Sequence, residues 1–216
     1  MANLLNDQVK DQIKSHLTQM VNPVTMVLFT QANQEACMYC EETQSLLEEV
    51  SALNDKLSVE VKDLDNDQDL ATQYGVTLTP SFVMLDSEGN YSGVKFNGIP
   101  AGHEINSFLS GILGMSGADP GFDAATLERI KKINKPVDIK VFVTLSCPHC
   151  PGAVAKAHQL AMLNPHVQGE MIEANTFQAL SQQYNVSGVP KIVINDNIEL
   201  LGDQPIEAFL NSIEQL

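Results

Sequence analysis

Residues 140–151 read KVFVTLSCPHCP, in which an apolar segment runs directly into Cys147-Pro148-His149-Cys150. A short apolar run is typical of a buried strand, and a proline directly after Cys147 suits the first turn of a helix. Cys147 is therefore predicted to lie at a helix N-terminus, where unpaired N–H groups and the helix dipole favour a thiolate. Because the thiolate is the attacking form, this stretch predicts a nucleophilic Cys147, with Cys150 one turn away to form or resolve a disulfide.

The same pattern occurs 110 residues earlier, where Cys37-Met38-Tyr39-Cys40 follows an apolar run from Val24 to Thr30. The shift of 110 also matches Leu70, Gln73, Tyr74, Val76 and Pro80 with Leu180, Gln183, Tyr184, Val186 and Pro190. A segment of small residues and turn formers, 114–121, separates the two copies. The repeat predicts two units of ordinary domain size, 1–117 with the first cysteine pair and 118–216 with the second.

The predicted elements follow the same order in both units. In the first unit they are a helix over about 5–20, strands over 24–30, 57–61 and 82–85, a helix after the cysteines, a short helix ending near 74, a hairpin turn at 86–90 with a strand after it, and a helix over 101–113. The second unit ends with a helix over about 205–215. Strand–helix–strand followed by helix–strand–strand–helix predicts an α/β fold, a mixed sheet flanked by helices in each unit.

A proline stands forty positions after the second cysteine of each pair. Pro80 follows Thr79 and Pro190 follows Val189, and each begins an apolar strand. Proline removes a donor from the strand ladder, so its recurrence at one offset predicts a cis peptide bond in a tight turn beside the cysteines. The alternative is an ordinary trans proline that opens a strand.

Together these features resemble the thioredoxin fold, and two such units in one chain resemble the protein disulfide oxidoreductases, or glutaredoxin-like proteins. The second unit is also similar to the thiol module of the flavoprotein that reduces alkyl hydroperoxide peroxiredoxins. The resemblance covers nearly the whole chain. It implies nucleophilic roles for Cys37 and Cys147, resolving roles for Cys40 and Cys150, and cis prolines in the substrate-side loops Thr79-Pro80 and Val189-Pro190.

The match departs from thioredoxin itself in two places. Neither pair reads Cys-Gly-Pro-Cys, and the strand predicted before Cys147, Lys140 to Thr144, holds no acidic residue for a proton relay. His149, expected near position N2 of the helix, is predicted with Pro148 to lower the pKa of Cys147. The other four histidines are expected in packing or surface roles.

Composition excludes several function classes. The 216 residues carry 12 basic and 27 acidic side chains, a net charge of −15, which repels nucleic acid and anionic membranes. The one basic cluster, Lys131, Lys132 and Lys135, is predicted to be the solvated end of a helix. No apolar run is long enough to span a bilayer, and residues Met1 to Asp7 predict no signal peptide, so a cytoplasmic location is expected.

The cysteines leave three kinds of function open. The first is thiol–disulfide exchange with protein substrates, or, more narrowly, an electron shuttle to a peroxiredoxin. The others are a redox-inactive chaperone or scaffold and a four-cysteine zinc site, which the long gap between Cys40 and Cys147 disfavours. No metal and no cofactor beyond the redox-active disulfides is predicted. Because no Gly-x-Gly-x-x-Gly follows a strand, electrons are expected from a separate thioredoxin-reductase-like flavoenzyme.

Overall fold

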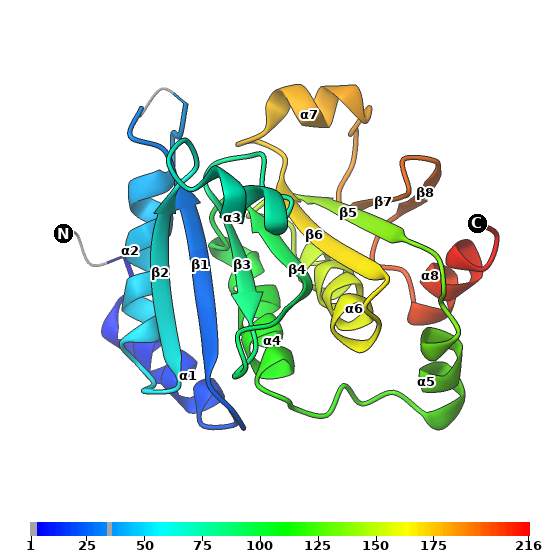
Figure 1. The fold of residues 1–216 in the computed structure, drawn as a ribbon, viewed down its shortest axis with the longest axis horizontal. Coiled ribbons are helices and arrows are strands. Elements are labelled where there is room, and N and C mark those ends of the chain that lie inside the picture. Colours follow the sequence, from blue (N-terminus) through cyan, green and yellow to red (C-terminus); the bar gives the residue numbers. More distant parts are fainter. Residues whose placement is uncertain (1–3, 34–35) are drawn as a thin grey trace.

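The computed structural model describes residues 4–33 and 36–216. Within this part of the chain, eight strands form one continuous mixed sheet in the order β2-β1-β3-β4-β6-β5-β7-β8 (Figure 1). Met1, Ala2 and Asn3, which belong to the segment searched for a signal peptide, lie outside the described residues. None of the helices described is long and apolar enough to cross a membrane.

The first four strands make up the first unit. Its elements are α1 (Asp7–Leu17), β1 (Val24–Thr30), α2 (Cys40–Ser51), β2 (Leu57–Asp63), α3 (Gln68–Gln73), β3 (Ser81–Leu85), β4 (Tyr91–Asn97), the 3-10 helix η1 (Gly102–Glu104) and α4 (Ile105–Met115). The central strand β1 pairs parallel with β2 and antiparallel with β3. All five residues of β3 are buried, which explains the apolar run that follows Ser81.

The second unit repeats this order with four more strands. Its elements are α5 (Ala124–Lys131), β5 (Val137–Val143), α6 (Cys150–Leu163), β6 (Val167–Glu173), α7 (Gln178–Gln183), β7 (Lys191–Ile194), β8 (Ile198–Leu201) and α8 (Ile206–Ile213). Its central strand β5 pairs parallel with β6 and antiparallel with β7. The predicted fold class, two tandem thioredoxin-like units with mixed sheets, is confirmed. The division at residue 118 stays a prediction.

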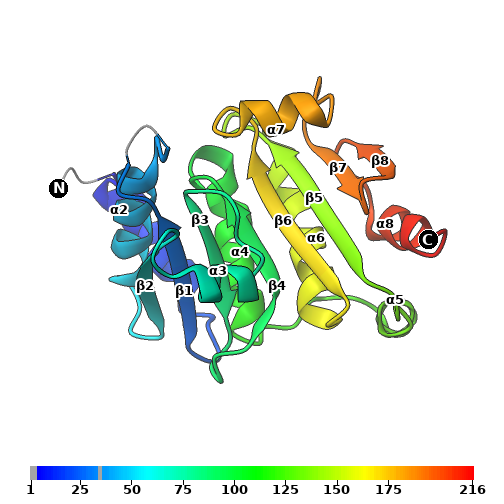
Figure 2. The ribbon, with the colours of Figure 1, turned by 45° about the horizontal axis from the view of Figure 1, so that its top comes forward.

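The helices cover the sheet unequally. One large core holds apolar side chains from α1, α2 and α4 of the first unit and from α5, α6 and α8 of the second. Among the helices described, only α3 and α7 cover the opposite face (Figure 2). Each of these helices packs on a small apolar cluster. Because both cysteine-bearing helices lie on the same face, their large core is shared.

The two units meet along β4 and β6, which pair in parallel from Val94↔Gly169 to Asn97↔Ile172. A polar network lies along this pairing, defined here as the seam. Lys95 donates to the carbonyl oxygen of Gly75 at 2.7 Å and pairs with Glu170 at 3.2 Å. Asn97 donates to the other carboxylate oxygen of Glu170 at 2.9 Å. The side chains of Lys95 and Asn97 are buried, so the seam satisfies its polar groups internally.

Candidate functional site

Each cysteine motif follows the central strand of its unit. Cys37–Cys40 and Cys147–Cys150 are both disulfides, with Cα atoms 5.5 Å apart in each pair. The helices begin at Cys40 and Cys150, so the prediction that Cys147 opens the helix is wrong by one turn. The reason is local, because the N–H of Cys147 donates to the carbonyl oxygen of Thr144 at 3.1 Å and closes a turn at the strand end.

The same turn corrects the placement of the residues between the cysteines. His149 is the N-cap of α6 rather than its second residue, and Pro148 precedes the helix. Both side chains are exposed, and His149 makes no capping hydrogen bond. In the first motif, Met38 is 72% exposed. The tuning role of Pro148 and His149 stays a prediction.

The two disulfides differ in which cysteine is accessible. In the second motif Cys147 is 8% exposed and Cys150 is fully buried. In the first motif the order is reversed, with Cys37 at 3% and Cys40 at 7%. A nucleophile that must be reached from outside is therefore better placed in the second motif than in the first.

The loops that carry the prolines lie beside the cysteines. The Thr79–Pro80 and Val189–Pro190 peptide bonds are both cis, which confirms the predicted geometry; their substrate-side role stays a prediction. The Cys147 sulfur lies 3.8 Å from the carbonyl oxygen of Val189. In the first unit, the Thr79 hydroxyl donates to the side-chain oxygen of Gln31 at 2.7 Å, which ties that loop to the end of β1.

One hollow is lined by the first motif, and another is lined by the proline loop of the second unit. The hollow at the first disulfide has a volume of about 490 Å³ and is lined by both cysteines and by Glu41 and Glu42. The other has a volume of about 320 Å³ and reaches from Thr144, at the end of β5, to Val189. The first hollow is thus lined by its disulfide, whereas the second is lined by neither Cys147 nor Cys150 and runs along the loop that contacts Cys147.

A buried carboxylate of the first unit lies on a 3-10 helix that packs against the helix of the second motif. Glu104 ends η1, which packs against α6, and the N–H of His103 donates to the carbonyl oxygen of Leu145 at 2.9 Å. The Glu104 side chain is fully buried, Ser107 donates to one of its oxygens, and the other has no partner among the described residues. Burial raises the pKa of Glu104 to about 7, which the hydrogen bond from Ser107 opposes. A carboxyl that titrates near neutral pH can accept or supply the proton of a thiol.

Sequence reasoning missed Glu104 because it sought a carboxylate on the strand before Cys147. That strand, β5, begins at Val137 rather than Lys140, so it does contain an acidic residue, Asp138. Asp138 pairs with Lys140 at the opposite end of the strand from Cys147, and burial raises its pKa. The buried carboxylate Glu104 instead comes from the other unit, on a 3-10 helix that contacts α6 and is hydrogen-bonded to Leu145, which no local sequence signal indicates.

The two cysteine pairs do not form one site. Their motifs follow β1 and β5, which are four strands apart in the sheet, or about 19 Å at the usual strand spacing. This separation rules out the four-cysteine zinc site considered from the sequence. Among the described residues, no group of three or more histidine, cysteine or acidic side chains could hold a metal ion.

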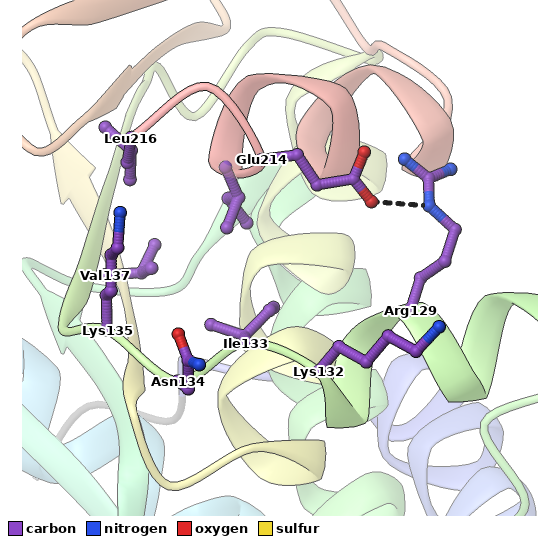
Figure 3. A pocket seen from close by; sticks show the side chains of 9 residues that line it. Arg129, Lys132, Ile133, Asn134, Lys135, Val137, Glu214 and Leu216 are labelled. Carbon is purple, nitrogen blue, oxygen red and sulfur yellow. Dashed lines mark hydrogen bonds and ion pairs between the residues drawn. The ribbon is translucent and has the colours of Figure 1, made fainter.

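The basic cluster lies away from both disulfides. Its members are at or just beyond the C-terminal end of α5, namely Lys131, Lys132 and Lys135. A cavity of about 390 Å³ lies between α5 and α8, where Arg129 pairs with Glu214 at 2.8 Å (Figure 3). Val137 lines this cavity and begins β5, so the cavity is at the end of the strand opposite to Cys147.

A central strand, a Cys-x-x-Cys disulfide, a helix and an adjacent cis-proline loop, present twice, define a thioredoxin-fold disulfide oxidoreductase. The chain belongs to the thioredoxin domain family, which matches residues 31–110 and 137–215. These two matches cover both cysteine motifs and both proline loops.

Solved structures of two relatives cover both units. The alkyl hydroperoxide reductase protein AhpF of Enterococcus faecalis is 30% identical, with a TM-score of 0.90, over 97% of this chain and 99% of that chain. A protein disulfide oxidoreductase from Aeropyrum pernix is 29% identical, with a TM-score of 0.88, over 97% of this chain and 92% of that one. Both resemblances expected from the sequence are thereby confirmed.

Curated relatives are longer than this chain. The corresponding alkyl hydroperoxide reductase protein of Staphylococcus aureus is 30% identical over 89% of this chain, which is 34% of that protein. The chain spans little more than a third of the length of the curated relatives it matches.

Proposed function

We propose that this chain exchanges disulfides with protein substrates through a mixed disulfide formed at Cys147. The observation that carries the proposal is the arrangement of the second motif. Cys147 is the more exposed cysteine of the pair at 8%, Cys150 is fully buried, and the hollow of about 320 Å³ runs along the loop that contacts Cys147. A partner cysteine can reach the first sulfur but not the second, which gives the two cysteines separate roles.

The exchange follows from these roles. In the reduced protein the Cys147 thiolate attacks a substrate disulfide, forms a mixed disulfide and expels one substrate thiolate. Cys150 then attacks Cys147, forms the intramolecular disulfide and releases the second substrate thiolate. Two electrons pass to the substrate, and the two thiolates take up the two protons that Cys147 and Cys150 give up. In this proposal Glu104, with a pKa of about 7, accepts a proton from the second motif.

A narrower candidate is an electron shuttle from a flavin-dependent disulfide reductase to a peroxiredoxin. It is favoured by the similarity to AhpF over nearly the whole chain. In this candidate the substrate disulfide belongs to the peroxiredoxin, and the chemistry at Cys147 is unchanged. A cytoplasmic location is part of the proposal, because a reducing compartment keeps the dithiol available.

The experiment traps the mixed disulfide. A Cys150→Ser variant in a Cys37→Ser/Cys40→Ser background leaves Cys147 as the one attacking thiol and removes its resolving partner. Incubation with a disulfide-bonded model protein should give a covalent adduct that dithiothreitol releases. The matched control adds Cys147→Ser and should give no adduct; an equal yield from both variants, or none from either, overturns the proposal.

The shuttle is tested by stoichiometry. The Cys37→Ser/Cys40→Ser variant, reduced and freed of reductant, should lose two thiols per chain when mixed with an oxidised peroxiredoxin. Thiol loss with the model protein but not with the peroxiredoxin would reject the shuttle and leave the broader function in place.

A further inference from the structure

An ion pair lies against the first turn of the helix that carries the second disulfide. The Lys156 ammonium is 2.6 Å from a carboxylate oxygen of Asp203 and 3.2 Å from the carbonyl oxygen of Gly152. Lys156 belongs to α6, whereas Asp203 belongs to the loop between β8 and α8. The side chains are 24% and 33% exposed, so water screens the pair only in part.

The carboxylate of Asp203 lies directly over Gly152. A Cβ atom at this glycine would collide with the nearer carboxylate oxygen, so a side chain there would displace Asp203. Gly152 is the second residue after Cys150, within the first turn of α6. The negative charge is therefore held at the helix end that also stabilises a thiolate on Cys147.

The same loop is bonded to the proline loop. The N–H of Gly202 donates to the carbonyl oxygen of Pro190 at 2.9 Å, and Asp203 is the next residue. Pro190 follows Val189, whose carbonyl oxygen lies 3.8 Å from the Cys147 sulfur. The contact with Lys156 and the backbone bond to Pro190 thus fix Asp203 relative to the disulfide from two sides.

The first unit has no such pair at the corresponding described positions. There the N–H of Gly98 donates to the carbonyl oxygen of Pro80 at 2.8 Å, and the next residue is the buried Ile99. The shift of 110 places Glu42 and Leu46 at the positions of Gly152 and Lys156. The pair is therefore a feature of the second disulfide and not of the repeated scaffold.

We propose that Asp203 and Lys156 are positioning residues that set the stability of the Cys147 thiolate through two opposing charges. Asp203 competes with the thiolate for the positive end of α6, and Lys156 offsets that competition. The inference rests on the proposed function only in taking Cys147 as the attacking thiol. The redox poise of the second disulfide then depends on a loop that follows the last strand of the sheet.

Other charged or titratable groups lie in the motif or on the elements next to it. They are His149 in the motif, Glu104 and His103 of η1, Glu173 at the end of β6 and Lys191 at the start of β7. They remain the same in each variant below, so a difference between variants reports on the ion pair.

The experiment titrates Cys147 in a Cys37→Ser/Cys40→Ser background by the ultraviolet absorbance of the thiolate. Asp203→Asn leaves Lys156 uncompensated and should lower the pKa of Cys147 by about half a unit. Lys156→Met leaves Asp203 uncompensated and should raise that pKa by a similar amount. The double variant should return close to the parent value, because both charges are gone.

Opposite signs separate an electrostatic role from a structural one. If the two side chains acted only through packing, both single variants would shift the pKa of Cys147 in the same direction. The double variant would then not return to the parent pKa. Asp69→Asn and Lys14→Met, exposed charges on the first unit, are the matched controls and should leave the titration unchanged. Shifts of the same sign, or no larger than those of the controls, overturn the inference. The titration requires no substrate, so its outcome is independent of the trapping experiment.

Discussion

The two disulfides lie on the same scaffold but in different surroundings. Both follow a central strand, begin a helix at the second cysteine and lie beside a cis-proline loop. The first is bordered by the exposed Met38 and by acidic residues directly after Cys40. The second has a proline and a histidine between its cysteines and an ion pair at its helix. A repeated fold therefore repeats the geometry of the cysteines without repeating their electrostatics.

The second unit also depends on the first for part of its surroundings. Glu104 reaches it from η1, and the buried His158 of α6 hydrogen-bonds to the carbonyl oxygen of Lys95 in β4 at 3.1 Å. In the first unit, the shift of 110 places Glu48 at the position of His158. Joining two similar sheets edge to edge thus makes the units unequal, because contacts across the seam serve them differently.

The largest expected effect separates the two pairs by activity. Cys147→Ser should leave less than about a tenth of the disulfide reductase activity, because it removes the accessible nucleophile. Cys37→Ser should leave most of it. The measurement is reduction of a model protein disulfide by excess dithiothreitol. A larger loss from Cys37→Ser would reverse the assignment of the second pair as the main site of exchange.

The next effect concerns acid stability at the seam. Burial lowers the pKa of His158 to about 4, although its hydrogen bond to Lys95 opposes this. Below the ordinary value of 6.5 the unfolded chain binds a proton that the folded chain excludes. The contribution of His158 to stability is therefore complete above pH 6.5 and is lost as the pH falls toward 4, by about 2 kcal/mol between pH 7 and pH 5. Over the same range Glu104 acts in the opposite direction, because its raised pKa makes the folded chain bind a proton more readily than the unfolded chain.

Urea unfolding at pH 7 and pH 5 measures this loss when every protein compared carries Glu104→Gln, which removes the opposing contribution of Glu104. His158→Gln should reduce the difference in unfolding free energy between the two pH values. The matched control is His166→Gln, on an exposed residue, which should keep the difference. If His158→Gln and His166→Gln both keep the full difference in unfolding free energy between pH 7 and pH 5, the acid sensitivity does not come from His158.

The third effect tests Glu104, the carboxylate of the first unit whose 3-10 helix packs against the second unit. Glu104→Gln should slow exchange at the second pair by about tenfold and remove an inflection near pH 7 from its rate profile. Because burial raises the pKa of Glu104, its contribution to stability is complete below 4.5 and is lost as the pH rises through 7. The Gln variant should therefore be no less stable than the parent at pH 8, which separates lost catalysis from unfolding.

A second buried carboxylate provides the control for Glu104. Both oxygens of Glu173 accept hydrogen bonds, from Asn175 and Thr176. Glu173→Gln should leave the inflection near pH 7 in place. An inflection that survives Glu104→Gln and disappears in Glu173→Gln would assign the proton transfer to Glu173 instead.

The local sequence pattern predicted the features that occur in both units, and it missed the contacts between the units. The spacing of the cysteines and of Pro80 and Pro190 predicted both motifs, because each depends on contacts within one unit. The parallel pairing of β4 with β6 could not be predicted from the sequence of either strand. The pattern of apolar residues indicates that a segment is a strand, but it does not indicate which other strand lies beside it. Glu104 was missed for the same reason, as its surroundings exist only once the two units meet.

The smallest expected effect belongs to His149, the residue by which the two motifs differ most visibly. As the N-cap of α6 it lies between the two cysteines, and a partial positive charge there stabilises a thiolate on Cys147. Because the side chain is exposed, solvent screens that charge, so the contribution should be less than about half a pKa unit and smaller than that of the ion pair. His149→Tyr, in the Cys37→Ser/Cys40→Ser background, should raise the pKa of Cys147 and make the disulfide less oxidising, since a less stable thiolate disfavours the dithiol. The reciprocal change, Tyr39→His with Cys147 and Cys150 replaced by serine, should lower the pKa of Cys37. If neither titration moves, the residues between the cysteines do not distinguish the two disulfides, and the difference lies with Asp203, Lys156 and the helix itself.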